Sequence, residues 1–263
     1  MELITLLSLL LLGLAVGLII SLLGVSGSVF VVPILLLFYS TSIYSAIGTS
    51  LFIDMVGATI VAIVYFRQEK VDLSVTLLLI LTALVGSQIG VLVAVRTGEA
   101  SLSNLVCVIF IGIGVIILYR TQKQLKNPEA LESPKVIFKS ERQKRVVISL
   151  IGLFIGLMSG LFGAGGGMMI IFVLLVVFQY PSHLAVGTAT AIMAFIAFSG
   201  VIGYSIQGFI NFEYGFIISI GAVVSGSVGS VFSGKLNETT LRIVMGVIFI
   251  LVGILTLFLL TIL

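Results

Sequence analysis

The chain has 263 residues, of which 60% are hydrophobic and only 9% are charged, and its mean hydropathy is +1.36. A soluble domain carries about 25% charged residues, so this chain has too little polar surface to cover a globule in water. The net charge is only +3, and eight of the thirteen Lys and Arg residues lie between Arg120 and Arg145, which argues against a nucleic-acid-binding face. Composition therefore predicts a polytopic membrane protein.

Apolar stretches of about 18 or more residues predict membrane-spanning helices, since about 20 helical residues cross the hydrocarbon core. The first stretch follows Met1-Glu2 without a basic region and is too long for a signal peptide, so we expect a retained helix. Two shorter apolar pieces, 29–39 and 168–180, each follow a break rich in Gly and Ser. The eight long predicted spans are 3–23, 43–66, 73–95, 102–119, 146–163, 182–205, 213–234 and 241–262.

The segment 121–145 is polar, contains two prolines and carries mixed charge, and we interpret it as a cytoplasmic linker. It separates a first repeat, 1–120, from a second repeat, 146–263. Seven of the eleven glycines before the linker meet another glycine when 139 is added to their number. Duplication of this kind is typical of transporters. The pairs are Gly13 with Gly152, Gly17 with Gly156, Gly24 with Gly163, Gly27 with Gly166, Gly48 with Gly187, Gly90 with Gly229 and Gly114 with Gly253.

The distribution of basic residues indicates how the two repeats are oriented. If the two short pieces dip in and return, the repeats are parallel, and Arg96, Lys235 and Arg242 lie outside with ten basic residues inside. If each short piece completes a crossing, twelve basic residues lie inside and only Arg96 lies outside, which fits the positive-inside rule better. The sequence thus predicts an all-α fold of two inverted repeats, about ten crossings of the plasma (inner) membrane, and both termini outside.

The two breaks predict a binding site for an anion. They read LLGVSGSVFVVP over 22–33 and LFGAGGGMMIIF over 161–172. Backbone that leaves a helix inside a membrane must be shielded by protein or line a wet cavity. We expect new helices to begin at Ser28 and Gly167, so that free N–H groups and the positive helix ends point into the breaks. The alternative is tight helix packing without a ligand. The predicted site residues are Ser26, Gly27, Ser28, Gly165, Gly166 and Gly167.

A second repeated motif lies further along each half, where SAIGTSLF over 45–52 matches LAVGTATA over 184–191. Its hydroxyls either bind a substrate oxygen or bond carbonyls of the preceding helical turn, as Ser and Thr commonly do in spans. Gln88, in the third predicted span, is a further candidate for lining the path. The hydroxyl-bearing candidates for substrate binding are Thr49, Ser50, Thr188 and Thr190.

The paired Gly-rich breaks, each followed about twenty residues later by G-T-(S/A) within a duplicated membrane protein, resemble the sulfite exporter TauE/SafE family. The resemblance covers nearly the whole chain except the linker. It implies export or uptake of small organic or sulfur oxyanions, such as sulfite, sulfoacetate or related carboxylates, with export as the expected direction, and it suggests coupling to an ion gradient. The first repeat departs from the glycine triplet of the pattern, because it has Ser26-Gly27-Ser28. For such a duplication we expect alternating access, with one repeat rocking against the other.

Two titratable residues are candidates for coupling transport to protons. Asp54 lies at the centre of the span 43–66. A carboxylate at that depth costs free energy, so its presence indicates a functional residue. We predict that Asp54 is protonated for part of the cycle; the alternative is a neutral Asp hydrogen-bonded to a neighbouring helix. His183, the sole histidine, follows Pro181 near a predicted membrane face, where it is either an interfacial residue or a second proton carrier.

Two rival functions stay open at this point. An anion channel would use the breaks as a filter. An intramembrane serine protease would use Ser26 of Gly24-Val25-Ser26-Gly27 as nucleophile and His183 as base, although the counterpart of Ser26 is Gly165. Motifs for zinc, phosphate or cysteine-bound cofactors are absent from the sequence, so we expect no enzyme, cofactor or metal. The expected partners are a small anion, lipid and protons or another coupling ion, without nucleic acid, and a homo-oligomer is compatible with the sequence.

Overall fold

The computed structural model describes residues 3–72, 76–98, 101–102, 141–163, 166–178 and 180–233, and every regular element among them is helical. Six of these helices are long and apolar enough to cross a membrane, so the chain is an all-α, multi-pass membrane protein. In chain order, the elements are α1 (Leu3–Leu23), α2 (Ser28–Tyr39), α3 (Ile43–Arg67), α4 (Thr76–Arg96), α6 (Glu141–Phe162), α7 (Gly167–Phe172), the π-helical segment η2 (Val173–Val177), α8 (Ser182–Ile206) and α9 (Phe212–Ser233).

The predicted spans that fall on described residues are confirmed, with bounds that differ by a few residues at most apart from the start of α6. Both predicted helix starts after the breaks are also confirmed, because α2 begins at Ser28 and α7 begins at Gly167. The short piece predicted over 168–180 is divided between α7 and a π-helical turn. The predicted spans 102–119 and 241–262, together with most of the linker, lie outside the described residues.

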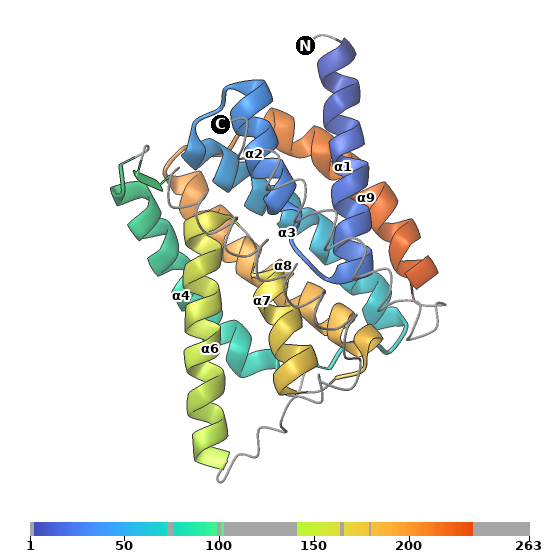
Figure 1. Ribbon diagram of the computed structural model, residues 1–263, viewed down its shortest axis with the longest axis vertical. Helices are drawn as coiled ribbons and strands as arrows, with labels where there is room; N and C mark the ends of the chain where they lie inside the picture. The colour runs from blue at the N-terminus through green and yellow to red at the C-terminus, as the bar shows by residue number, and fades with distance from the viewer. Residues whose placement is uncertain are drawn as a thin grey trace, which may run out of the picture.

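The duplication in the sequence is repeated in the helices and in their contacts. Helices α3 and α8 begin 139 residues apart (43 and 182), as do α2 and α7 (28 and 167). Helix α1 packs on α9 at one side of the molecule, and the equivalent pair, α6 and α4, packs at the other side (Figure 1). A methyl group at Gly17 would lie 2.3 Å from the carbonyl oxygen of Ala222, and one at Gly156 would lie 2.0 Å from that of Ala83. The equivalent glycines thus make equivalent contacts with the opposite half.

The central pair of equivalent helices, α3 and α8, runs antiparallel. Gly48 near the start of α3 contacts Tyr204 near the end of α8, and Gly187 near the start of α8 contacts Tyr65 near the end of α3. Both tyrosines are fully buried. The Tyr65 hydroxyl donates to the carbonyl of Ser21 (2.8 Å) in α1, and the Tyr204 hydroxyl donates to the carbonyl of Gly160 (2.9 Å) in α6. These bonds fix each central helix against the first helix of a repeat.

Helix α2 returns toward the beginning of α1. The hydroxyl of Tyr39, at the end of α2, lies 2.6 Å from the hydroxyl of Ser8 near the start of α1. The left-handed backbone of Gly24 (φ 65°) reverses the chain between the two helices. The first break therefore lies at the tip of a helical hairpin, and α1 and α2 present that tip to the interior of the bundle.

The outward faces of the helices are apolar. Ile4 of α1 is 77% exposed and Val228 of α9 is 66% exposed, and exposed Leu, Ile and Val side chains also cover α4. An apolar surface of this extent suits the hydrocarbon of a bilayer. In lipid the hydrophobic effect does not hold helices together, so packing depends on close backbone approach at small residues.

We predict that Gly156→Ala destabilises the bundle, because its methyl group has to fit against the backbone carbonyl of Ala83. Overpacking against backbone costs about 1–3 kcal/mol, which lowers the apparent Tm in detergent by about 2–10 °C. Gly98→Ala is the matched control, because nothing lies within 4 Å of the added atom. Thermal unfolding of the two variants beside the parent chain measures the difference, and equal Tm values would contradict the packing described here.

Candidate functional site

The first break joins α1 to α2 through buried residues. The N–H of Gly24 donates to the carbonyl of Ile20 (3.0 Å) and completes the last turn of α1. Gly27 then precedes α2 as its N-cap residue and has no side chain of its own to cap the helix. The first N–H groups of α2 have no carbonyl four residues earlier in a helix to bond, so they need other acceptors inside the membrane.

The second break begins in the same way as the first and ends differently. Gly163 has a left-handed backbone (φ 70°), as its counterpart Gly24 has. Gly166, however, is left-handed (φ 71°), whereas its counterpart Gly27 has φ −76°. Gly165, a predicted site residue, lies outside the described residues. The duplicated breaks are therefore alike where the helix ends and unlike where the next helix begins.

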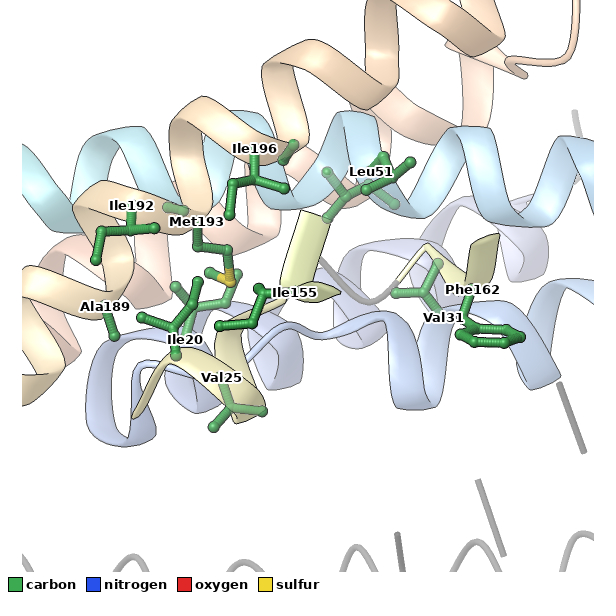
Figure 2. Close-up of a cluster of buried hydrophobic side chains, with 14 of the residues drawn as sticks. Ile20, Val25, Val31, Leu51, Ile155, Phe162, Ala189, Ile192, Met193 and Ile196 are labelled. Atoms are coloured by element: carbon green, nitrogen blue, oxygen red, sulfur yellow. The ribbon is translucent and has the colours of Figure 1, made fainter. Parts of the chain in front are cut away.

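The two breaks contact each other inside the bundle. A methyl group at Gly167 would lie 2.7 Å from the backbone nitrogen of Ser26 and 3.0 Å from the carbonyl oxygen of Gly24. Only a residue without a side chain permits this approach. Figure 2 shows that buried apolar side chains from several helices, among them Ile155 of α6 and Met193 of α8, surround this region. The predicted site residues of the two repeats are thus brought together at Ser26 and Gly167.

Asp54, in the middle of α3, provides the acceptor for the first break. Its carboxylate accepts the N–H of Gly27 (3.0 Å) and the hydroxyl of Ser26. The N–H of Ser28 donates to the Ser26 hydroxyl oxygen (3.1 Å), which also lies 2.7 Å from the Ser28 hydroxyl. Among the residues whose side chains the structure describes, Asp54 is the only buried Asp, Glu, Lys, Arg or His. The positive end of α2 therefore faces an intramolecular carboxylate.

The pairing of Asp54 with the first break was missed by the sequence reasoning, which treated the break and the carboxylate as separate features. The second repeat has Met193 at the position equivalent to Asp54, and its sulfur lies 2.7 Å from where a methyl group at Gly167 would be. Both side chains are fully buried. Equivalent positions of the two repeats thus carry different groups: a carboxyl acceptor in the first repeat and an apolar thioether in the second.

The hydroxyl candidates of the repeated Gly-Thr motif have protein partners. Thr49 accepts the backbone N–H of Asn211 (2.9 Å), and Thr188 accepts that of Asp72 (3.0 Å). Thr190 donates to the carbonyl of Gly187 (2.9 Å) in its own helix. Ser50 donates to the carbonyl of Ile47 (2.8 Å) and lies 3.2 Å from that of Gly163, so it alone of these residues touches a break.

The remaining candidates lie on other elements. Gln88 of α4 donates to the carbonyl (2.5 Å) and the hydroxyl (2.9 Å) of Ser199, so its amide joins α4 to α8. His183 lies in the first turn of α8 and is partly buried. The hydroxyl of Ser26 is hydrogen-bonded to Asp54 and Ser28 rather than to His183, so the Ser–His pair expected of a protease is not formed. Within the described residues there is no cluster of three metal-binding side chains.

Comparison with known proteins adds independent information. The family model described as "Sulfite exporter TauE/SafE" matches residues 9–256. The "Probable membrane transporter protein YunE" of Bacillus subtilis (strain 168) is 26% identical over 256 residues, which cover 92% of this chain and 93% of that protein. A second such protein of that organism, YdhB, is 25% identical over 86% of this chain and 89% of its own length. A third probable membrane transporter protein, from Methanocaldococcus jannaschii, is 24% identical over 94% of this chain and 93% of its own length. No solved structure matches the chain.

We predict that Gly167→Ala disrupts the junction of the two breaks, because its methyl group meets backbone atoms of Ser26 and Gly24. Overpacking against backbone costs about 1–3 kcal/mol, so the apparent Tm in detergent falls by about 2–10 °C. The added methyl group also meets the sulfur of Met193. A double variant with Met193→Ala removes that sulfur but leaves the backbone contacts in place, so we expect that it does not restore the Tm. Gly57→Ala is the control, because its nearest neighbour is the flexible end of the Ile20 side chain. A Gly167→Ala chain as stable as the parent would show that the breaks do not touch.

Proposed function

Because this chain is a membrane transporter of the sulfite exporter TauE/SafE family, we propose that it is a secondary transporter of small organic or sulfur oxyanions. Sulfite, sulfoacetate and related carboxylates are the proposed substrates, and export is the proposed direction. The observation that carries the proposal is the meeting of two unwound, glycine-rich segments inside the bundle, where Gly167 lies against Ser26. Main-chain N–H groups at such a place are suited to bind the oxygens of an anion.

The charges in the bundle support an oxyanion held by hydrogen bonds. No Lys or Arg is buried among the described residues, so a buried cation does not hold the anion there. The donors at the first break are the N–H groups of Gly27 and Ser28 and the hydroxyls of Ser26 and Ser28. Sulfonate and carboxylate oxygens accept such bonds in the way that the Asp54 carboxylate accepts them. Ser50 lies next to the second break and adds a further hydroxyl.

Asp54 couples the transport of the anion to a proton in this proposal. Its carboxylate occupies the donors that an oxyanion needs, namely the N–H of Gly27 and the hydroxyl of Ser26. A neutral carboxyl is a weaker acceptor than a carboxylate, so protonation of Asp54 frees these donors for the substrate. One proton then moves together with each anion. Net flux follows the combined gradients, and a cell loaded with the oxyanion exports it.

The two halves are inverted repeats in this proposal, with about ten crossings and the linker 121–145 in the cytoplasm. The antiparallel course of the equivalent helices α3 and α8 supports it, since helices related by an in-plane axis run in opposite directions. The Tyr39–Ser8 contact supports it too, since α2 runs back in the direction opposite to α1, as a short piece that completes a crossing requires. The distribution of basic residues supports a course of α3 from outside to inside in the plasma membrane. Alternating access then rocks one repeat against the other.

We expect purified protein in proteoliposomes to accumulate sulfoacetate when the side that holds the substrate is acidic. Sulfoacetate is the best probe, because its sulfonate keeps its charge while pH changes the charge of sulfite. Sulfite, thiosulfate and small carboxylates complete the panel, and uncharged dimethyl sulfone is the size-matched control. A channel dissipates gradients without accumulating anything, so flux that never exceeds equilibration would reject the proton-coupled carrier. Equal transport of the sulfone would reject the oxyanion.

We expect Asp54→Asn to transport without responding to pH. The amide is neutral at every pH, so substrate exchange continues while accumulation driven by a pH gradient disappears. Glu213→Gln is the matched acid-to-amide control, because Glu213 is exposed in the first turn of α9. Radiolabelled sulfoacetate uptake with and without a pH gradient measures both properties. Proton coupling through Asp54 is excluded if the variant still accumulates substrate when the gradient is applied.

A further inference from the structure

The two copies of the Gly-Thr motif hold the ends of α3 and α8 together. At one end, the Thr49 hydroxyl accepts the N–H of Asn211, which follows α8. At the opposite end, the Thr188 hydroxyl accepts the N–H of Asp72, which follows α3. Both threonines are fully buried, and the donors are 139 residues apart, as the threonines are (72 and 211; 49 and 188). Each bond thus joins one repeat to the other.

The glycine of each motif forms the second part of the same contact. A methyl group at Gly48 would lie 2.2 Å from the carbonyl oxygen of Phe209, and one at Gly187 would lie 2.1 Å from that of Lys70. The glycine therefore lets the incoming chain approach the helix, and the threonine accepts its N–H. This explains why Gly and Thr recur together in both halves. We call Gly48, Thr49, Phe209 and Asn211 the first clasp, and Gly187, Thr188, Lys70 and Asp72 the second clasp.

The two clasps lie on opposite sides of the break junction. Along α3, Thr49 precedes Asp54 by five residues, and along α8, Thr188 precedes Met193 by five residues. Because α3 and α8 are antiparallel, the junction lies between the clasps. With α3 and α8 across the bilayer, one clasp lies toward each side of the junction. In this structure Ser26, Asp54 and Met193 at the junction are buried.

The clasps differ in what supports the donor residue. In the second clasp, the Asp72 side chain accepts the hydroxyl of Tyr180 (2.7 Å). In the first clasp, the Asn211 side chain accepts the N–H of Tyr214 (3.1 Å) and thereby caps α9. Opening either clasp therefore also moves a neighbouring element.

We propose that the two Gly-Thr clasps are the gates of the transporter. The first clasp opens to one side of the membrane while the second stays closed, and the second opens to the other side while the first stays closed. The inference rests on alternating access in the proposed function, and it assigns Thr49 and Thr188 to gating rather than to substrate binding. Two discrete arrangements of packed helices are what such a transition requires. Removing one hydroxyl acceptor leaves its buried N–H donor unsatisfied and favours the state in which that clasp is open.

The test measures how fast a cysteine at the junction reacts from each side of the membrane. Met193→Cys in a Cys107→Ser background is the reporter, because Met193 is buried at the junction. Membrane-impermeant maleimide is added to right-side-out and to inside-out vesicles, without any transport substrate. Exposed Gln207→Cys and Glu69→Cys chains identify the side on which each clasp lies.

We expect Thr49→Val to raise labelling of the reporter by about tenfold from the side of Gln207 and to lower it from the other side. Thr188→Val does the reverse. Thr49→Ser and Thr188→Ser keep the acceptor and behave as the parent. If the valine variants do not fold, Thr49→Ala and Thr188→Ala remove the same acceptor without branched bulk.

Reciprocal changes support the clasps as gates. The proposal is overturned if labelling changes equally from both sides of the membrane, or if it stays unchanged in both variants. The measurement needs no substrate, so a failure of the oxyanion panel leaves it intact. Conversely, pH-driven sulfoacetate transport together with non-reciprocal labelling rejects the gates and retains the proposed function. Reciprocal labelling with Gln207→Cys reacting on the cytoplasmic side supports the gates and rejects the proposed orientation.

Discussion

The structure depends on one constraint: backbone N–H groups that leave a helix inside lipid must find acceptors within the protein. In the first break, side chains provide these acceptors, since the Asp54 carboxylate accepts the N–H of Gly27 and the Ser26 hydroxyl accepts the N–H of Ser28. A buried carboxylate is costly, and the donors around it offset that cost. The same groups that make the break tolerable in a membrane are those that an oxyanion would use. In the proposed function, folding and transport would therefore depend on the same few hydrogen bonds.

The close packing of the bundle follows from the same environment. Apolar side chains gain little by leaving lipid for one another, so helices associate where backbones approach. Gly17 against Ala222, and its equivalent Gly156 against Ala83, bring α1 to α9 and α6 to α4. Each repeat thus contributes a helix to either side of the bundle. The interdigitated arrangement explains why the halves cannot be treated as separate units, although the linker divides them in the sequence.

Much of the fold could be predicted from the sequence, because long apolar runs in a membrane have few alternatives to helix. The starts of α2 and α7 at Ser28 and Gly167 followed from the position of the glycines. The site could be predicted only in part. That Asp54 faces Gly27 depends on the depth and rotation of two helices, which hydropathy does not encode. The partners of Thr49 and Thr188 come from the opposite repeat, and only the shared offset of 139 between Asn211 and Asp72 carried a signal.

The exchange of Asp54 for Met193 between the halves removes the energetic equivalence of the two sides. In a strictly duplicated molecule, the states open to either face would have equal free energies and equal affinities. Here a carboxyl group approaches the junction from one half only, so in the proposed alternating-access cycle the two states would stabilise a bound anion unequally. Half-saturation would then differ between the two faces, while the equilibrium distribution of substrate would stay as the gradients dictate. Such a transporter would be kinetically polarised even when the solutions on its two sides are identical.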